Sequence, residues 1–93
     1  MLAIARGMMS SPSLILVDEP SLGLAPQITT IVFDGLDALR KNGVTILLVE
    51  QNVTKTLQIT DRGYVLEKGK IVLDGKSFDL ANNDHVRKIY LGL

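Results

Sequence analysis

The chain has 93 residues, enough for one domain with a modest hydrophobic core. Lys plus Arg and Asp plus Glu number 10 each, so the formal net charge is zero, and the basic surface of a nucleic-acid-binding protein is not expected. Cysteine is absent, which excludes a disulfide scaffold and a cysteine-ligated zinc site. The apolar runs are too short to span a bilayer, and the start shows no signal-peptide pattern.

The first expected elements are a helix and a buried strand. Residues 1–10 are rich in Met, Leu and Ala and predict a helix that Ser11-Pro12 stops. Residues 14–17 are all apolar and predict a strand buried on both faces of a parallel sheet. Pro20 ends this strand because it cannot donate a hydrogen bond to a neighbouring strand.

A helix and a second strand are expected next. The helix begins with Pro26 in its first turn and ends at Asn42-Gly43. Residues 44–49 are rich in β-branched side chains and predict another buried strand, which completes a parallel βαβ unit. Four apolar residues at helical spacing are expected to form the buried face of the helix: Ile28, Val32, Leu36 and Leu39.

The rest of the chain predicts a hairpin between short helices. A helix is expected over residues 53–60 and one or two more over residues 77–91. Residues 64–67 and 70–73 predict the two hairpin strands, joined by a Lys-Gly pair whose glycine supplies a positive φ. Asp74-Gly75 is expected to be a turn.

Polar side chains follow both predicted parallel strands. Asp18 and Glu19 end the first strand, and Glu50, Gln51 and Asn52 follow the second. Ligands of open α/β sheets bind at this carboxyl edge. A phosphoryl-transfer site needs one carboxylate to hold Mg²⁺ and a second group to orient the attacking water. Asp18 and Glu19 suit these two roles; the alternative is two solvated acids at the end of a core strand.

Two other sequence features are weaker candidates for a functional site, one for phosphate binding and one for a metal. Gly75-Lys76-Ser77 resembles the end of a phosphate-binding loop, but the glycine needed five positions earlier is Lys70. We expect a surface turn there, with Ser77 as a helix cap. His85 is the only histidine, and no second ligand stands near it in sequence, so a metal or catalytic role is not expected.

Three segments resemble, in order and spacing, the ATP-binding subunits of ABC transporters. They are Leu-Ile-Leu-Val-Asp-Glu-Pro at residues 14–20, Ser-Leu-Gly-Leu-Ala-Pro at residues 21–26 and Thr-Ile-Leu-Leu-Val-Glu-Gln-Asn at residues 45–52. The segment Val-Glu-Gln-Asn and the ending Tyr90-Leu91-Gly92 are similar to the branched-chain amino-acid importers. The resemblance covers residues 1–93 and implies an α/β fold. It further implies that the chain is the C-terminal part of a P-loop NTPase domain of the ABC type, after the signature sequence and without the Walker A loop.

The resemblance implies roles for individual residues. Asp18 corresponds to the Walker B aspartate that holds Mg²⁺, and Glu19 to the carboxylate that polarises the attacking water. Gln51 stands where most members carry a histidine that touches the γ-phosphate; its amide can still donate a hydrogen bond but cannot become cationic. Most members also carry an aspartate at the position where this chain has Ala25. The loop that crosses to the partner subunit comprises Ser21, Leu22, Gly23, Leu24 and Ala25.

The resemblance further implies a function for the complete protein. It would hydrolyse ATP with Mg²⁺, on the cytoplasmic face of the membrane, to drive uptake of branched-chain amino acids. Its partners would be a second ATP-binding subunit and membrane permease subunits, without nucleic acid. Two alternatives stay open: a non-enzymatic dimerisation or regulatory fragment of the fold, and a soluble ABC ATPase without a transporter. We expect the reading frame upstream of Met1 to encode Leu-Ser-Gly-Gly and, before it, a Gly-x-x-x-x-Gly-Lys-Ser/Thr loop.

The 93-residue chain on its own is expected neither to bind nor to hydrolyse ATP. The missing glycine-rich loop and its lysine supply most contacts to the phosphates, and a lone Asp18 would bind Mg²⁺ weakly. Phosphate release with ATP and Mg²⁺ present, compared with a Glu19→Gln control, measures this. Release above that control would contradict the expectation.

Overall fold

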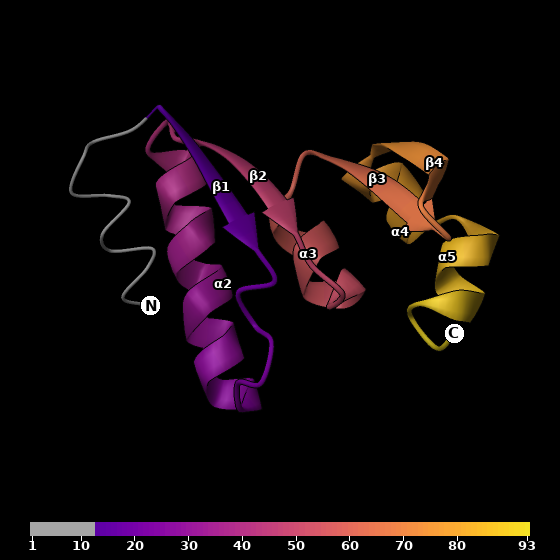
Figure 1. Ribbon diagram of the computed structural model, residues 1–93, viewed down its shortest axis with the longest axis horizontal. Coiled ribbons are helices and arrows are strands. Elements are labelled where there is room, and N and C mark those ends of the chain that lie inside the picture. Colours follow the sequence, from indigo (N-terminus) through magenta and orange to yellow (C-terminus); the bar gives the residue numbers. More distant parts are fainter. Residues whose placement is uncertain (1–12) are drawn as a thin grey trace. The chain divides into compact units, whose positions relative to one another are not determined.

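The computed structural model describes residues 13–93, which form two compact units, one ending at Gln51 and one beginning at Asn52 (Figure 1). The helix predicted over residues 1–10 lies outside the described residues. Within residues 13–93, no helix combines the length and the apolar character needed to cross a membrane.

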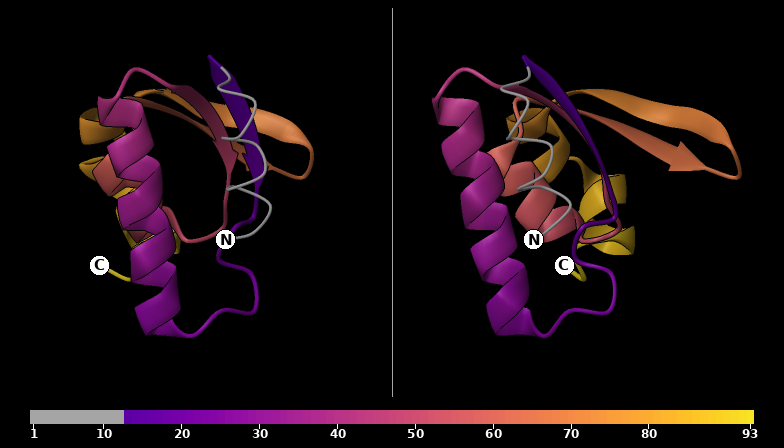
Figure 2. Two further views of the ribbon diagram at one scale, coloured as in Figure 1. Left: turned by 90° about the vertical axis from the view of Figure 1, so that its left-hand side faces the viewer. Right: turned by 60° about the vertical axis from the view of Figure 1, so that its left-hand side comes forward.

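The first unit is the predicted parallel βαβ unit. Strand β1 (Leu14–Asp18) leads to helix α2 (Pro26–Lys41), which leads to strand β2 (Thr45–Val49). The strands pair in parallel from Leu14 opposite Thr45 to Asp18 opposite Val49. Helix α2 runs alongside both strands in every view of Figures 1 and 2.

One face of this two-stranded sheet is buried and the other is exposed. Ile15 and Val17 are buried on β1, whereas Leu14 and Leu16 are 53% and 70% exposed. The prediction that this strand is buried on both faces is therefore wrong for this chain. Side chains alternate along a strand, and α2 can cover only the face toward which it packs.

The buried face of α2 is turned slightly from the predicted one. Ile28 is 42% exposed, and Leu39 is half-buried. The buried side chains follow the i, i+3, i+4, i+7 spacing of a single helical face and are Thr29, Val32, Phe33 and Leu36. The apolar pattern omitted Thr29 because threonine is polar, and it omitted Phe33 although Phe33 is apolar.

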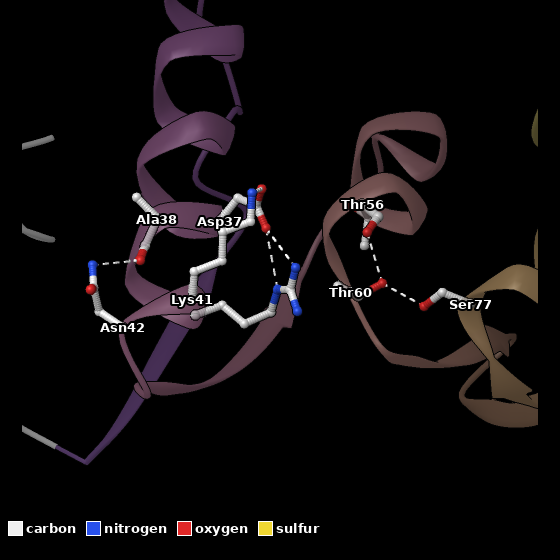
Figure 3. A network of polar contacts seen from close by, with 8 residues as sticks. Asp37, Ala38, Lys41, Asn42, Thr56, Thr60 and Ser77 are labelled. Carbon is white, nitrogen blue, oxygen red and sulfur yellow. Dashed lines mark hydrogen bonds and ion pairs between the residues drawn. The ribbon is translucent and has the colours of Figure 1, made fainter.

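The C-terminal end of α2 is stabilised by local polar contacts (Figure 3). The carboxylate of Asp37 accepts a hydrogen bond from Arg40 at 2.9 Å and pairs with Lys41 at 3.1 Å. These contacts lower the pKa of Asp37, chiefly through Arg40. Asn42 caps the helix, and Gly43 follows with a φ of 91°, as a helix ending in Asn-Gly predicts.

The second unit contains an antiparallel hairpin with short helices. It comprises α3 (Val53–Ile59), β3 (Arg62–Glu67), β4 (Lys70–Lys76), α4 (Ser77–Ala81) and α5 (Asp84–Ile89). The two turn residues, Lys68 and Gly69, both have positive φ, as a tight two-residue hairpin turn requires.

The hairpin is longer than predicted. Asp74-Gly75 lies inside β4 and is not a turn, because Gly75 pairs with Gly63 of β3 and Asp74 with Tyr64. The two glycines place backbone opposite backbone without side chains. Leu80 approaches there: a Cβ added to Gly63 would lie 2.8 Å from the Leu80 side chain.

Ser77 packs into the second unit and does not cap a helix. It is buried, and its hydroxyl lies 2.7 Å from that of Thr60 (Figure 3). Lys76 holds the N-cap position of α4 without a side-chain hydrogen bond. Gly75-Lys76-Ser77 thus joins a hairpin strand to a five-residue helix, unlike the strand–loop–helix of a phosphate-binding loop.

Glu67 joins the hairpin to the C-terminal segment. Its Oε2 accepts a hydrogen bond from the Tyr90 hydroxyl at 2.5 Å and lies 3.0 Å from Nε2 of His85. The Tyr90 bond, and then the His85 contact, lower the pKa of Glu67. The same bond raises the pKa of Tyr90.

Leu36→Ala should destabilise the first unit more than Ile31→Ala. Leu36 is 1% exposed, so its truncation leaves a cavity and costs about 2–5 kcal/mol. Ile31 lies on the same helix but is 54% exposed, and its change should cost roughly 0.5 kcal/mol or less. Urea unfolding followed by circular dichroism compares the two; equal losses would contradict the assignment of the buried face.

The second unit should lose stability in acid through Glu67. Because folding lowers the pKa of Glu67, its contribution is present above the unfolded-state pKa and is lost as the pH falls through the folded-state value. Glu67→Gln should therefore reduce the dependence of the unfolding midpoint on pH below about pH 4.5. Asp79→Asn, which removes an exposed carboxylate from α4, is the control. An acid dependence unchanged by Glu67→Gln would refute this role.

Candidate functional site

The candidate site lies where β1 and β2 end. Because the strands are parallel and in register, Asp18 lies directly opposite Val49 at one edge of the sheet. The pairing continues one residue further, since the Glu19 amide donates to the Val49 carbonyl at 2.6 Å. The polar residues that follow each strand therefore start from adjacent positions.

Glu19 and Gln51 are brought into direct contact. The Gln51 amide nitrogen Nε2 donates to Oε1 of Glu19 at 2.9 Å, across 32 positions of sequence. These are the two residues for which the resemblance implies catalytic roles. The amide carries two N–H groups, so it has a second hydrogen to offer another acceptor.

Glu19 has an unusual backbone conformation. Its φ is +45°, in the left-handed region that non-glycine residues rarely adopt and that costs roughly 1–2 kcal/mol. Such residues persist where the surrounding structure over-determines them, and they cluster at functional sites. Here the bonds to Val49 and Gln51 hold Glu19 in place from both its backbone and its side chain.

Asp18 lies next to this pair but belongs to the exposed face of the sheet. It alternates with Leu14 and Leu16 on β1, and its side chain is exposed. Mg²⁺ prefers oxygen ligands and commonly takes one or two carboxylates together with water and substrate phosphates. An accessible carboxylate at this position, with Glu19 beside it, fits that donor set.

The loop after Glu19 is built from two turns. The amides of Leu22 and Leu24 donate to the carbonyls of Glu19 and Ser21, each at 3.1 Å. Gly23 has a φ of +75°, which the loop needs for its change of direction. Leu22 is 72% exposed, so the loop presents an apolar side chain at its tip.

Ala25 occupies the N-cap position of α2. Its backbone is extended, its carbonyl accepts the first helical bond from Thr29 at 2.9 Å, and it makes no side-chain cap bond. An aspartate, which the resemblance implies at this position in most family members, could accept a bond from the first turn of the helix. The departure at Ala25 therefore removes a helix cap as well as a polar group of the loop.

Glu50 is a functional candidate to which the sequence assigned no role. Its Oε2 accepts hydrogen bonds from the Ser21 hydroxyl at 2.8 Å and from the Ser21 amide at 3.2 Å. Its Oε1 accepts a hydrogen bond from the backbone N–H of Gln51 at 2.9 Å. The signal was present, because Glu50 follows a short apolar strand just as Glu19 does.

Known proteins share this sequence over nearly its full length, although no protein-family model matches it. The chain is 52% identical over 92 residues to the high-affinity branched-chain amino acid transport ATP-binding protein BraG of Pseudomonas aeruginosa, covering 99% of this chain and 40% of BraG. It is 35% identical to the probable branched-chain amino acid transport ATP-binding protein LivF of Archaeoglobus fulgidus, covering 100% of this chain and 40% of LivF. The chain is 32% identical to the lipopolysaccharide export system ATP-binding protein LptB of Escherichia coli K12, covering 96% of this chain and 37% of LptB.

Solved structures give the same result for the fold. An ATP-binding cassette of an ABC transporter in its ADP conformation matches with a TM-score of 0.76 at 30% identity, over 97% of this chain and 37% of that chain. The protein cbiO1 from Clostridium perfringens, part of the ABC transporter complex cbiONQ, matches with a TM-score of 0.78 at 26% identity, over 99% and 38%. The α/β fold class predicted from the sequence is confirmed. The chain spans about two fifths of the length of these relatives.

Proposed function

This chain belongs in sequence and fold to the ATP-binding proteins of ABC transporters and corresponds to their C-terminal part. We propose that it carries the residues that hydrolyse ATP in such a protein, namely Asp18, Glu19 and Gln51, which we call the hydrolytic edge. The observation that carries the proposal is the hydrogen bond between Gln51 and Glu19 at the carboxyl end of β1 and β2. It joins an acceptor and a donor, next to Asp18, at the edge where such sheets bind ligands.

Each of the three residues has a distinct role in this proposal. Asp18 would hold Mg²⁺, and the chemistry supplied by the bound ion would be to neutralise charge on the phosphate oxygens of ATP. Glu19 accepts a hydrogen bond from the attacking water and orients it. Gln51 keeps the Glu19 side chain in one orientation through its first N–H and offers its second N–H to a phosphate oxygen.

The neutral amide of Gln51 changes the electrostatics of the site. A protonated histidine would place positive charge beside Glu19 and the phosphate, whereas glutamine supplies only hydrogen bonds. Positioning is retained, because the amide still donates hydrogen bonds to ionised acceptors. Charge stabilisation is weaker, because a neutral amide brings no positive charge to the phosphate.

We propose transport as the purpose of this hydrolysis. Identity is higher to BraG, at 52%, than to LptB, at 32%, which favours branched-chain amino acids as the substrates. Uptake would require membrane permease subunits and a second ATP-binding subunit, with this subunit on the cytoplasmic face of the membrane. The exposed loop tip at Leu22 and Gly23 suits a contact with that second subunit.

In the complete ATP-binding protein, Glu19→Gln should abolish ATP turnover and leave nucleotide binding nearly unchanged. The reason is that Glu19 is assigned to the water and not to the nucleotide. Gln51→Ala should slow turnover by about tenfold, the effect of roughly one hydrogen bond. Steady-state phosphate release and equilibrium binding of a fluorescent ATP analogue separate the two effects. Equal losses of affinity and rate in Glu19→Gln would show that Glu19 binds the nucleotide.

A further inference from the structure

Glu50 bonds to the polypeptide segments that follow both strands. Through Oε2 it accepts from the amide and the hydroxyl of Ser21, which follows β1. Through Oε1 it accepts from the backbone amide of Gln51, at the end of β2. The two oxygens of one half-buried carboxylate thus fix two separate segments.

Two side-chain links cross between the strands in opposite directions. Gln51, which follows β2, bonds to Glu19 after β1, while Glu50 after β2 bonds to Ser21 after β1. Glu19 and Ser21 are separated only by Pro20, whose ring restricts the backbone between them. Any movement of Ser21 is therefore transmitted to Glu19 over a very short stretch of stiff chain.

The left-handed backbone of Glu19 needs such support. A strained φ of +45° is kept only if surrounding bonds make other conformations less favourable. Bonds from neutral donors to a carboxylate are among the stronger hydrogen bonds in proteins. Glu50 supplies such bonds on the far side of Pro20, and it also holds the backbone of the residue that bonds Glu19.

We infer that Glu50 is a positioning residue: its carboxylate holds Ser21 and the Gln51 backbone, so that the Glu19 carboxylate and the Gln51 amide stay paired at the hydrolytic edge. This inference rests on the proposed function and extends it, because it assigns a role to a residue that need not touch ATP or the attacking water. Glu50 acts through Ser21 on one side and through Gln51 on the other.

The test uses ATP turnover by the complete ATP-binding protein. Glu50→Ala should lower kcat by about tenfold with little change in the half-saturating ATP concentration, since only the positioning of the pair is lost. Glu50→Gln keeps one acceptor oxygen and nearly the same shape, so its kcat should lie between that of Glu50→Ala and that of the wild-type protein. Ser21→Ala should lower kcat less than Glu50→Ala does, and Ser21→Thr, which keeps the hydroxyl, should lower kcat less than Ser21→Ala does.

A double-mutant comparison shows whether Glu50 acts through Ser21. If it does, Ser21→Ala combined with Glu50→Ala should be no slower than Glu50→Ala alone. Asp37→Ala is the matched control, because it also removes a carboxylate that accepts local bonds, at the other end of α2. It should leave kcat unchanged. Fully additive losses in kcat for Ser21 and Glu50 would overturn the proposed route.

Amide hydrogen exchange supplies a readout that does not depend on activity. Glu50→Ala should remove protection from the Ser21 and Gln51 amides while the amides of β2 stay protected; unchanged protection would overturn the inference. If the wild-type protein hydrolyses ATP and Glu50→Ala has an equal kcat, the inference about Glu50 is overturned. The proposed function would not be affected by that result. A complete protein without any ATP turnover would instead refute the proposed function.

Discussion

The in-register parallel pairing of β1 with β2 is the constraint on which the site depends. It places Asp18 opposite Val49, so that both strands release their next residues at the same edge. The bond from the Glu19 amide to the Val49 carbonyl extends the pairing by one residue. A slip by one residue would move Glu19 away from Gln51 and turn the apolar side chains to the other face.

Two kinds of interaction, apolar burial and directional hydrogen bonds, have different roles in the first unit. Apolar burial of Ile15, Val17 and Leu36 holds the strands and α2 together, without setting the direction of any polar group. Hydrogen bonds at the strand ends are directional, and they fix Glu19 and Ser21 against Gln51 and Glu50. The apolar layer thus supplies stability, and the polar edge supplies the geometry that the proposed hydrolysis would require.

Gln51, which stands where the resemblance implies a histidine in most family members, is accommodated inside this chain. The glutamine amide reaches Glu19 directly, so the acidic residue keeps a donor even though no positive charge is available. Ala25, the other departure from the pattern that the resemblance implies, has no such compensation at its own position, because a methyl side chain cannot cap α2. The two departures therefore have different consequences: one exchanges a donor for another, and the other removes a cap.

The sequence by itself determined most of the described elements and the sheet edge at which the candidate site lies. Short apolar runs, Pro26 and Asn42-Gly43 predicted the βαβ unit, and the acids after each strand predicted a site at its carboxyl end, because these signals depend on neighbours in the chain. Only the tertiary structure decided which face of α2 is buried, that Gly75 pairs with Gly63 and that Glu50 holds Ser21. Those outcomes depend on contacts between residues distant in sequence, where packing and strand register choose among several partners that local patterns leave equally favourable.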